Sequence, residues 1–229
     1  MKLSIIIPVH NEQSTIAKVL WKVKRAETLG YEKEIIVIND GSTDNTKAIL
    51  EAIQKTMHFQ LFSHSFNQGK GAAIRTGLKH INGDLVIIQD ADLEYDPDDY
   101  KTLLGAANNS LVICGKRGVK KWPEQGLHYV LGAKLLTWLV NLLYGAHLTD
   151  LYTGYKLFPS SVIKNIDLKS NGFEFEAEVI CKVLKKGIKI KEVPIHYQPR
   201  SLKQGKHIGL KDAFKGLLTI VKLKHPAQP

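Results

Sequence analysis

The sequence predicts an α/β fold with a mainly parallel central sheet flanked by helices. Short, almost uninterrupted apolar runs, typical of strands buried on both faces, occupy residues 3–9, 34–38 and 85–88. Segments with apolar residues at helical spacing separate these runs. Because a connecting helix lets the chain return in the same direction, this alternation predicts parallel strands with helices on both faces of the sheet.

The first half of the chain supplies most of the predicted sheet. The expected strands are residues 3–9, 34–38, 60–62, 85–88 and 111–114. The expected helices carry their apolar residues at 16–23, at 49–57 and within 71–81, and Asp96-Pro97 opens a further one. Ser14, Asp44 and Asp96 are the expected N-caps, since short polar side chains accept hydrogen bonds from first-turn N–H groups.

The second half of the chain is less regular. Its expected elements are an apolar helix at 131–144, a strand at 155–158, a helix at 174–186, a strand at 188–193 and a basic loop at 198–207. A last helix, expected at 209–224, is amphipathic and has Leu210, Phe214, Leu217, Leu218 and Val221 on one stripe. No repeat divides the chain, so we expect a single domain over residues 1–229.

Composition excludes several classes of protein. With 229 residues, 44% hydrophobic and 24% charged, the chain can bury a substantial core and is not intrinsically disordered. Two cysteines, Cys114 and Cys181, are too few for a disulfide scaffold and favour a reducing compartment. No cleavable signal and no apolar stretch of ~20 residues is visible, so we expect a cytoplasmic protein without a membrane span.

The positive charge of the chain is concentrated near its C-terminal end. Residues 182–224 hold twelve Lys or Arg but only two acids, Glu192 and Asp212, which accounts for the whole net charge of +10. Such a segment attracts nucleic acid, an anionic phospholipid surface or a phosphorylated substrate. A solvated, lysine-rich helix face is the alternative explanation.

Three polar clusters follow predicted strands, at residues 10–12, 39–42 and 90–92. Ligands of parallel α/β sheets bind beyond the carboxyl ends of the strands, so we expect these clusters to meet in one crevice. Asp90 and Asp92, with Glu94 nearby, offer the hard oxygen ligands that Mg²⁺ or Mn²⁺ prefers together with substrate phosphates. The same acidic pattern also occurs as ordinary turn chemistry, and its position at a strand end favours the metal.

Two further loops carry candidate binding residues. Asp40 ends its strand, and its carboxylate could accept hydrogen bonds from a base or a sugar hydroxyl, whereas Asp44 is expected only to cap a helix. Residues 67–71 form a glycine-rich helix entry that suits an anion, with Lys70 adding charge. The patterns of a P-loop, of a dinucleotide-binding G-x-G-x-x-G turn after the first strand, of zinc-ligand spacing and of a G-x-S-x-G hydrolase are absent.

Taken in order, residues 5–12 (IIIPVHNE), 36–44 (IVINDGSTD) and 90–94 (DADLE) resemble glycosyltransferase family 2. The resemblance implies a GT-A (Rossmann-like) fold and sugar transfer from a nucleotide-sugar donor. Residues 150–158, 173–176 and 193–197, with Arg200 and Lys206, are similar to the dolichyl- or polyprenyl-phosphate hexose synthase branch. On this basis residues 1–115 form the nucleotide-sugar-binding half, 116–208 the acceptor half and 209–229 an amphipathic basic tail.

The resemblance also assigns roles to residues of this sequence. It implies that the nucleoside is held by Pro8, His10, Glu12, Ile38 and Asp40, and that the metal and the donor diphosphate are held by Asp90, Ala91, Asp92 and Glu94. It places Arg117 opposite the acceptor phosphate. Three features depart from the family pattern: Glu94 stands where relatives often have Gln, Lys116 replaces the usual Ser, and residues 128–134 lack the Arg and Ser that relatives carry after Trp122.

The expected reaction is attack of a lipid phosphate oxygen on the anomeric carbon, with displacement of a nucleoside diphosphate. The second pKa of a phosphate monoester is ~6, so the nucleophile is already largely ionised near neutral pH and needs charge neutralisation more than a base. We expect Arg117, Arg200 and Lys206 to bind this phosphate and Asp92 to hold the metal on the leaving group. Asp150 either orients the acceptor, acts as an auxiliary base or caps a loop. Inversion at the anomeric carbon is implied by the family.

The acceptor is open to other interpretations. The apolar helix at 131–144 beside the basic tail suits a helix lying in one leaflet of a membrane, although a buried core or dimer helix has the same pattern. A soluble or polysaccharide hydroxyl acceptor would require a base such as Asp150 or Glu176. A nucleic-acid-binding module would use the tail but leave the acidic strand ends without a role. We therefore expect a peripheral membrane transferase with no nucleic-acid partner, and GDP-mannose and UDP-glucose both stay possible donors.

Overall fold

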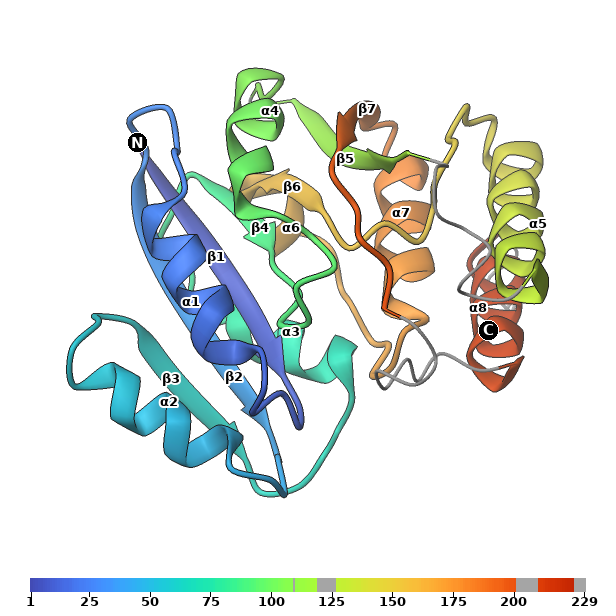
Figure 1. Cartoon of the computed structure of the whole chain (residues 1–229). Coiled ribbons are helices and arrows are strands. Elements are labelled where there is room, and N and C mark those ends of the chain that lie inside the picture. Colours follow the sequence, from blue (N-terminus) through green and yellow to red (C-terminus); the bar gives the residue numbers. More distant parts are fainter. Residues whose placement is uncertain (109, 119–126, 201–209, 225–229) are drawn as a thin grey trace.

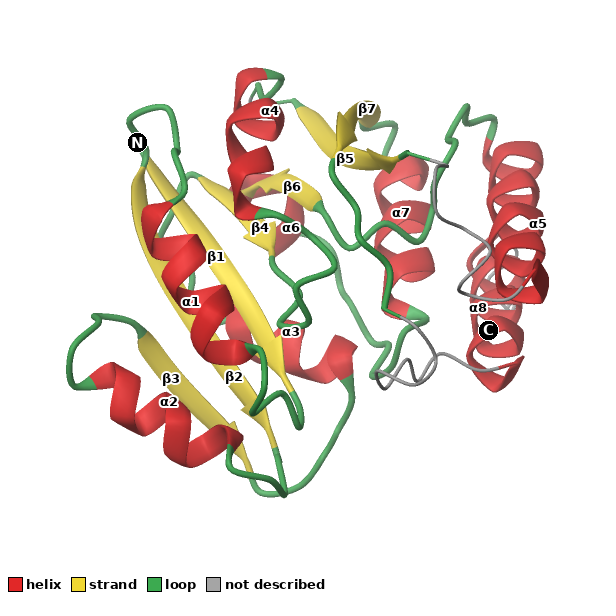
Figure 2. Ribbon diagram, in the orientation of Figure 1, coloured by secondary structure: helices red, strands yellow, loops and turns green. Residues whose placement is uncertain are grey.

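The computed structural model describes residues 1–108, 110–118, 127–200 and 210–224. These residues form a seven-stranded sheet covered by helices on both faces (Figures 1 and 2). The strands are β1 (Lys2–Val9), β2 (Glu32–Asp40), β3 (Gln60–His64), β4 (Leu85–Ile88), β5 (Leu111–Arg117), β6 (Lys156–Pro159) and β7 (Lys189–Ile195). Their order is β3-β2-β1-β4-β6-β5-β7, and β6 runs antiparallel to both of its neighbours. The predicted mainly parallel sheet is confirmed.

The helices alternate with the strands along the chain. They are α1 (Ile16–Arg25), α2 (Thr46–Gln54), α3 (Lys70–Leu78), α4 (Tyr100–Gly105), α5 (Leu127–Tyr144), α6 (Ser160–Lys164), α7 (Phe175–Lys185) and α8 (Leu210–Lys224), and a short 3₁₀ helix at Pro97–Asp99 precedes α4. None of the helices in the described part of the chain has the length and apolarity needed to cross a membrane.

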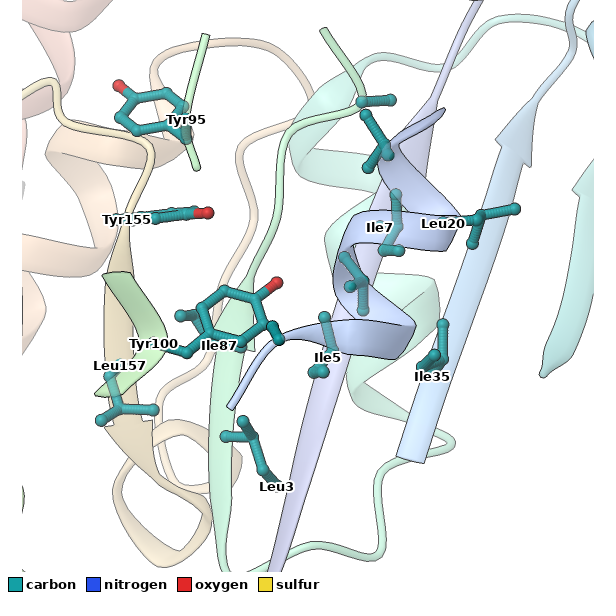
Figure 3. Close-up of a cluster of buried hydrophobic side chains, with 14 of the residues drawn as sticks. Leu3, Ile5, Ile7, Leu20, Ile35, Ile87, Tyr95, Tyr100, Tyr155 and Leu157 are labelled. Atoms are coloured by element: carbon teal, nitrogen blue, oxygen red, sulfur yellow. The ribbon is translucent and has the colours of Figure 1, made fainter. Parts of the chain in front are cut away.

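Side chains of β1 alternate between two hydrophobic clusters, one on each face of the sheet. Ile5 and Ile7 pack against α1 and α4 with Leu20 and Tyr100, as Figure 3 shows. Ile6 points to the other face, into a cluster that α3, α5, α7 and α8 cover. Burial on both faces explains why β1 and β2 appear in the sequence as continuous apolar runs.

The helix caps differ in part from those predicted. Asp96 accepts a hydrogen bond from the backbone N–H of Asp98 at 3.2 Å, as expected. The carboxylate of Asp44 accepts from the N–H of Thr46 at 2.9 Å, although Asn45 is the residue that precedes α2. Ser14 is not a cap: Thr15 precedes α1, and its hydroxyl binds the Glu12 carboxylate at 2.5 Å instead.

The two apolar helices of the second half are each buried on one side only. In α5, Val140 is fully buried while Trp138 is 57% exposed, so this helix is not wholly buried in the core. In α8, Ile220 is fully buried, whereas Phe214, Leu217, Leu218 and Val221 of the predicted stripe are exposed. Contacts along α5 and α8 place the two helices side by side over α7 (Figure 1).

Candidate functional site

The polar clusters that follow β1, β2 and β4 lie together at one edge of the sheet, as the sequence predicted. The backbone N–H of Thr43 donates to the side-chain oxygen of Asn11 at 2.8 Å, and the N–H of Glu12 donates to the hydroxyl of Thr46 at 2.8 Å. These bonds tie the loop after β1 to the loop after β2. Asn11 has a φ of +53°, a left-handed conformation that Asn tolerates better than most residues.

Arg200 joins the loop after β1 to the acidic loop after β4. Its guanidinium donates to both carboxylate oxygens of Glu12 at 2.9 and 2.7 Å and to the backbone carbonyl of Asp92 at 2.8 Å. Its backbone N–H donates to Glu94 at 2.7 Å. The structure therefore places Arg200 on the side predicted for the donor, with its side chain engaged by Glu12, whereas the sequence placed it opposite the acceptor phosphate.

The acidic loop holds three carboxylates with different surroundings. Asp90 lies 2.7 Å from the ammonium group of Lys70, and Glu94 accepts hydrogen bonds from Tyr197 at 2.9 Å and from Arg200. Burial, followed by the negative charges of Asp90 and Glu94, raises the pKa of Asp92 to about 7. Between Asp92 and Glu94 the backbone of Leu93 has a φ of +63°, which is strained for a bulky residue.

Asp90 and Asp92 fit a divalent cation as part of its ligand shell. A positive charge beside Asp92 would offset the burial and the neighbouring carboxylates that raise its pKa to about 7, and the donor atoms are hard oxygens. Within the described ranges, no three His, Cys, Asp or Glu side chains come together to enclose a metal ion. Mg²⁺ is often held by one or two carboxylates plus substrate phosphates, so a bound diphosphate would have to supply further ligands.

A buried chain of alternating charges leads away from Asp90. Lys70 lies 2.9 Å from Glu176, and Glu176 lies 2.5 Å from Lys156, whose side chain is fully buried. Burial by itself would lower the pKa of Lys70, but Asp90 and Glu176 raise it above its ordinary value. Burial would raise the pKa of Glu176, but Lys156 and Lys70 hold it below its ordinary value. Glu176 is thus an ionised partner of two lysines, a poor arrangement for a general base.

A hydrogen-bonded network beneath Asp90 was missed by sequence reasoning. The hydroxyls of Tyr100 and Tyr155 each donate to the side-chain oxygen of Gln89 at 2.7 Å, and the Gln89 amide donates to the carbonyl of Asp90 at 2.9 Å. Gln89 is fully buried, and Figure 3 shows both tyrosines in the core near Tyr95. The signal in the sequence that could have revealed this network is Gln89 itself, a polar residue directly after the apolar strand β4.

Several predicted donor-binding residues are less accessible than the sequence suggested. Asp40 is 2% exposed, and its carboxylate accepts from the backbone N–H groups of Gln68 at 2.9 Å and Gly69 at 2.7 Å and contacts His64 at 2.7 Å. It therefore orders the turn that leads into Lys70. Ile38 is fully buried because its position in β2 points its side chain into the core, so only its backbone is available to a ligand, and its contact with a nucleoside stays a prediction.

The remaining predicted donor residues lie near the end of β1 and in the loops after β1 and β4. Ala91 is 4% exposed with its methyl group in the core, so only its backbone is available to a ligand. Pro8 and His10 are partly exposed, and the His10 ring lies 2.8 Å from the backbone carbonyl of Asp40. Their contact with a nucleoside stays a prediction.

On the predicted acceptor side, Arg117 and Asp150 form one unit. The guanidinium of Arg117 donates to the two oxygens of Asp150 at 2.6 Å each and stacks over the ring of Tyr197 at 4.8 Å. Since both oxygens accept from Arg117, this geometry makes Asp150 a residue that positions Arg117. Tyr197 connects the pair to Glu94 of the acidic loop. Lys206, the third residue assigned to the acceptor phosphate, lies outside the described residues.

The fold and the acidic loop at the carboxyl end of β4 define a protein of the GT-A class. Glucosyl-3-phosphoglycerate synthase from Mycobacterium tuberculosis, in complex with UDP, superposes with a TM-score of 0.76 at 19% identity, over 97% of this chain and 80% of that chain. The same enzyme with Mn²⁺, UDP and phosphoglyceric acid gives a TM-score of 0.75 at 18% identity, over 99% of this chain and 80% of that chain.

Sequence comparison gives the family. Residues 4–166 match the model of glycosyl transferase family 2, and the chain belongs to this family. It is 30% identical over 217 residues to the dolichyl-phosphate beta-glucosyltransferase ALG5A of Trichomonas vaginalis, which is 85% of this chain and 65% of the relative. It is 30% identical over 204 residues to the low-salt glycan biosynthesis hexosyltransferase Agl6 of Haloferax volcanii, which is 86% of this chain and 48% of the relative. The chain therefore spans about half to two thirds of the length of these relatives, and the predicted family and fold are confirmed.

Proposed function

We propose that the chain transfers a hexose, with inversion, from a nucleotide-sugar to a polyprenyl or dolichyl phosphate. The observation that carries this proposal is that Tyr197 contacts both Glu94 of the acidic loop and Arg117. Tyr197 thus connects carboxylates that suit the cation of a donor diphosphate to a guanidinium that suits an acceptor phosphate. Asp90 and Asp92 suit the cation and the donor diphosphate, and Arg117 suits the acceptor phosphate. The activity named for the Trichomonas relative, a dolichyl-phosphate glucosyltransferase, supports the acceptor class.

In the proposed mechanism the protein holds two anionic groups in line and neutralises their charge. A divalent cation, when bound, supplies charge stabilisation for the departing diphosphate. Asp92 and Asp90 would hold that cation, with Glu94 close by. Arg117, fixed by its two hydrogen bonds to Asp150, orients the lipid phosphate, whose oxygen needs no proton removed near neutral pH. Glu176, itself paired with Lys156, holds the ammonium group of Lys70 beside the acidic loop.

The test is sugar transfer to a short polyprenyl phosphate in detergent. UDP-glucose and GDP-mannose are compared with Mg²⁺, with Mn²⁺ and with EDTA, and phosphoglyceric acid serves as a soluble acceptor in parallel. Glycolipid formed with one donor only in the presence of a metal would support the proposal and identify the sugar. Binding of a donor without any glycolipid would contradict the lipid acceptor, and transfer to phosphoglyceric acid would then replace it.

We further propose that the outward faces of α5 and α8 lie on a membrane surface. Two stripes of large apolar side chains are exposed there: Leu131, Leu135, Trp138 and Leu142 on α5, and Phe214, Leu217, Leu218 and Val221 on α8. The exposed charged side chains of these helices include Lys134, Lys211, Lys215 and Lys222. An apolar face bordered by lysines is typical of helices that lie in an anionic interface.

Replacing Trp138 and Phe214 together by Ser is expected to weaken binding to vesicles that contain anionic phospholipid by about tenfold or more. Each side chain is more than half exposed, so its removal costs little stability, while its insertion into lipid contributes hydrophobic free energy. Sedimentation with vesicles measures the effect. The matched control replaces Trp21 of α1 and Phe66 of the loop after β3, which are both exposed, and equal losses in both double variants would contradict a specific docking face.

A further inference from the structure

The charge chain Asp90–Lys70–Glu176–Lys156 has one fixed end and one accessible end. Lys156 is fully buried and also donates to the backbone carbonyl of Thr153, and the Glu176 side chain is only 4% exposed. The side chains of Lys70 and Asp90 are 14% and 17% exposed, so this end of the chain is reached by solvent. A change of partner is therefore easier at the Lys70–Asp90 contact than at the Glu176–Lys156 contact.

The backbone that carries Lys70 is held on both sides. A Cβ atom on Gly69 would lie 2.4 Å from the carbonyl oxygen of Asn171, and one on Gly71 would lie 2.4 Å from that of Ser170. This close approach of the segment at 170–171 fixes the start of α3. The backbone of Lys70 has little room to move, so its ammonium group can change partner only by rotation about the four bonds of the flexible side chain.

Lys70 and a divalent cation would compete for the same carboxylate. The ammonium group lies 2.7 Å from an oxygen of Asp90, and the neighbouring carboxylates keep it charged. A cation bound to Asp90 would stand beside that ammonium group, and two like charges at contact distance in a partly buried site repel strongly. The ammonium group must then leave Asp90 while Glu176, 2.9 Å away, still attracts it.

We propose that Lys70 is an exchangeable counter-ion: it neutralises Asp90 before a divalent cation binds and turns to the donor diphosphate once the cation replaces it. Glu176 keeps the ammonium group within reach during the exchange, so Glu176 is a positioning residue that acts through Lys70. This inference rests on the proposed function for the identity of the diphosphate. The competition between Lys70 and the cation is independent of the sugar and of the acceptor.

The test is titration of the purified chain with Mn²⁺ alone, followed by electron paramagnetic resonance, without donor or acceptor. Replacing Lys70 by Met removes the competing cation and is expected to tighten Mn²⁺ binding about tenfold. The same variant is expected to bind UDP or GDP about tenfold more weakly in the presence of Mn²⁺. Lys70→Arg keeps a positive charge beside Asp90 and is therefore expected to bind Mn²⁺ less tightly than Lys70→Met does.

Changing Glu176 should have the opposite effect on the metal. Glu176→Gln removes the second anion beside Lys70, so the ammonium group pairs more closely with Asp90 and Mn²⁺ binding weakens. Because this change leaves Lys156 buried without its carboxylate, Glu176→Gln combined with Lys156→Met provides a charge-balanced second variant. Thermal unfolding checks that each variant is folded.

The exchange predicts that Mn²⁺ binds more tightly to the Lys70→Met variant and more weakly to the Glu176 variants. A merely structural role of these residues does not produce opposite changes in Mn²⁺ affinity. If Lys70→Met binds Mn²⁺ no more tightly than the original protein, the exchange is refuted. Failure of the transfer assay alongside opposite Mn²⁺ shifts would refute the proposed acceptor or donor and leave the exchange standing.

Discussion

Replacing Asp92 by Asn is expected to lower metal-dependent sugar transfer at least ~10²-fold, the loss typical of removing one preorganised charge from an active site. The same change is expected to leave the melting temperature nearly unaltered. Asp92 accepts a hydrogen bond from the backbone N–H of Glu94 at 3.0 Å, which the amide oxygen of Asn can also accept. The carboxylate charge at this position is disfavoured by burial and by its acidic neighbours, so its removal costs the fold little.

The matched control is Asp98→Asn, which neutralises an exposed carboxylate six positions further along the chain. This variant is expected to keep transfer within about threefold of the original protein, since surface charges contribute little at a distance in salt. Initial rates are measured at several Mn²⁺ concentrations. These rates distinguish weakened Mn²⁺ binding from a loss of activity that does not depend on Mn²⁺. Turnover of the Asp92 variant near that of the original protein would remove Asp92 from the metal site.

The sheet was predictable because its strands are buried on both faces and therefore appear as continuous apolar runs. For the same reason, the sequence does not show to which face of the sheet an individual side chain points. Ile38 stands beside the polar cluster in sequence, yet its side chain points into the core because neighbouring strand positions alternate between faces. Ser14 was a plausible cap by residue type, but α1 begins after Thr15 instead. The Thr15 hydroxyl does not cap the helix either, because it donates to the Glu12 carboxylate.

Long-range pairings are the part of the site that local patterns do not specify. Arg200 binds Glu12 across nearly the whole chain, and Lys70 meets Glu176 only because α3 and α7 lie on the same face of the sheet. No spacing rule connects such residues, since the sheet order, with β6 inserted between β4 and β5, brings them together. The acidic loop could be recognised in the sequence, but only the fold shows that Lys70 and Arg200 are the basic residues that contact it.

Replacing Gly154 by Ala is expected to lower transfer by about 10²-fold, through displacement of the Asp90 carboxylate, which we propose to hold the cation. Gly154 lies in the loop between Asp150 and β6, and its N–H donates to the hydroxyl of Tyr95 at 2.7 Å. A Cβ atom there would lie 2.3 Å from a carboxylate oxygen of Asp90 and 2.8 Å from the ring of Tyr95. The Tyr95 ring is buried against Tyr155 and Tyr197, so the Asp90 side chain, which is the more accessible, has to move.

The Gly154 variant separates activity from stability. Overpacking at a buried site costs ~1–3 kcal/mol, which a domain of this size tolerates, so the variant should fold and lower the melting temperature by a few degrees. Gly132→Ala is the matched control, because a Cβ atom on Gly132 of α5 would have no atom within 4 Å. Transfer by the Gly154 variant within threefold of the control would show that the position of Asp90 is not critical. A loss of transfer with Mn²⁺ binding also weakened would locate the damage at Asp90, because an oxygen of that carboxylate is the atom nearest to the added methyl group.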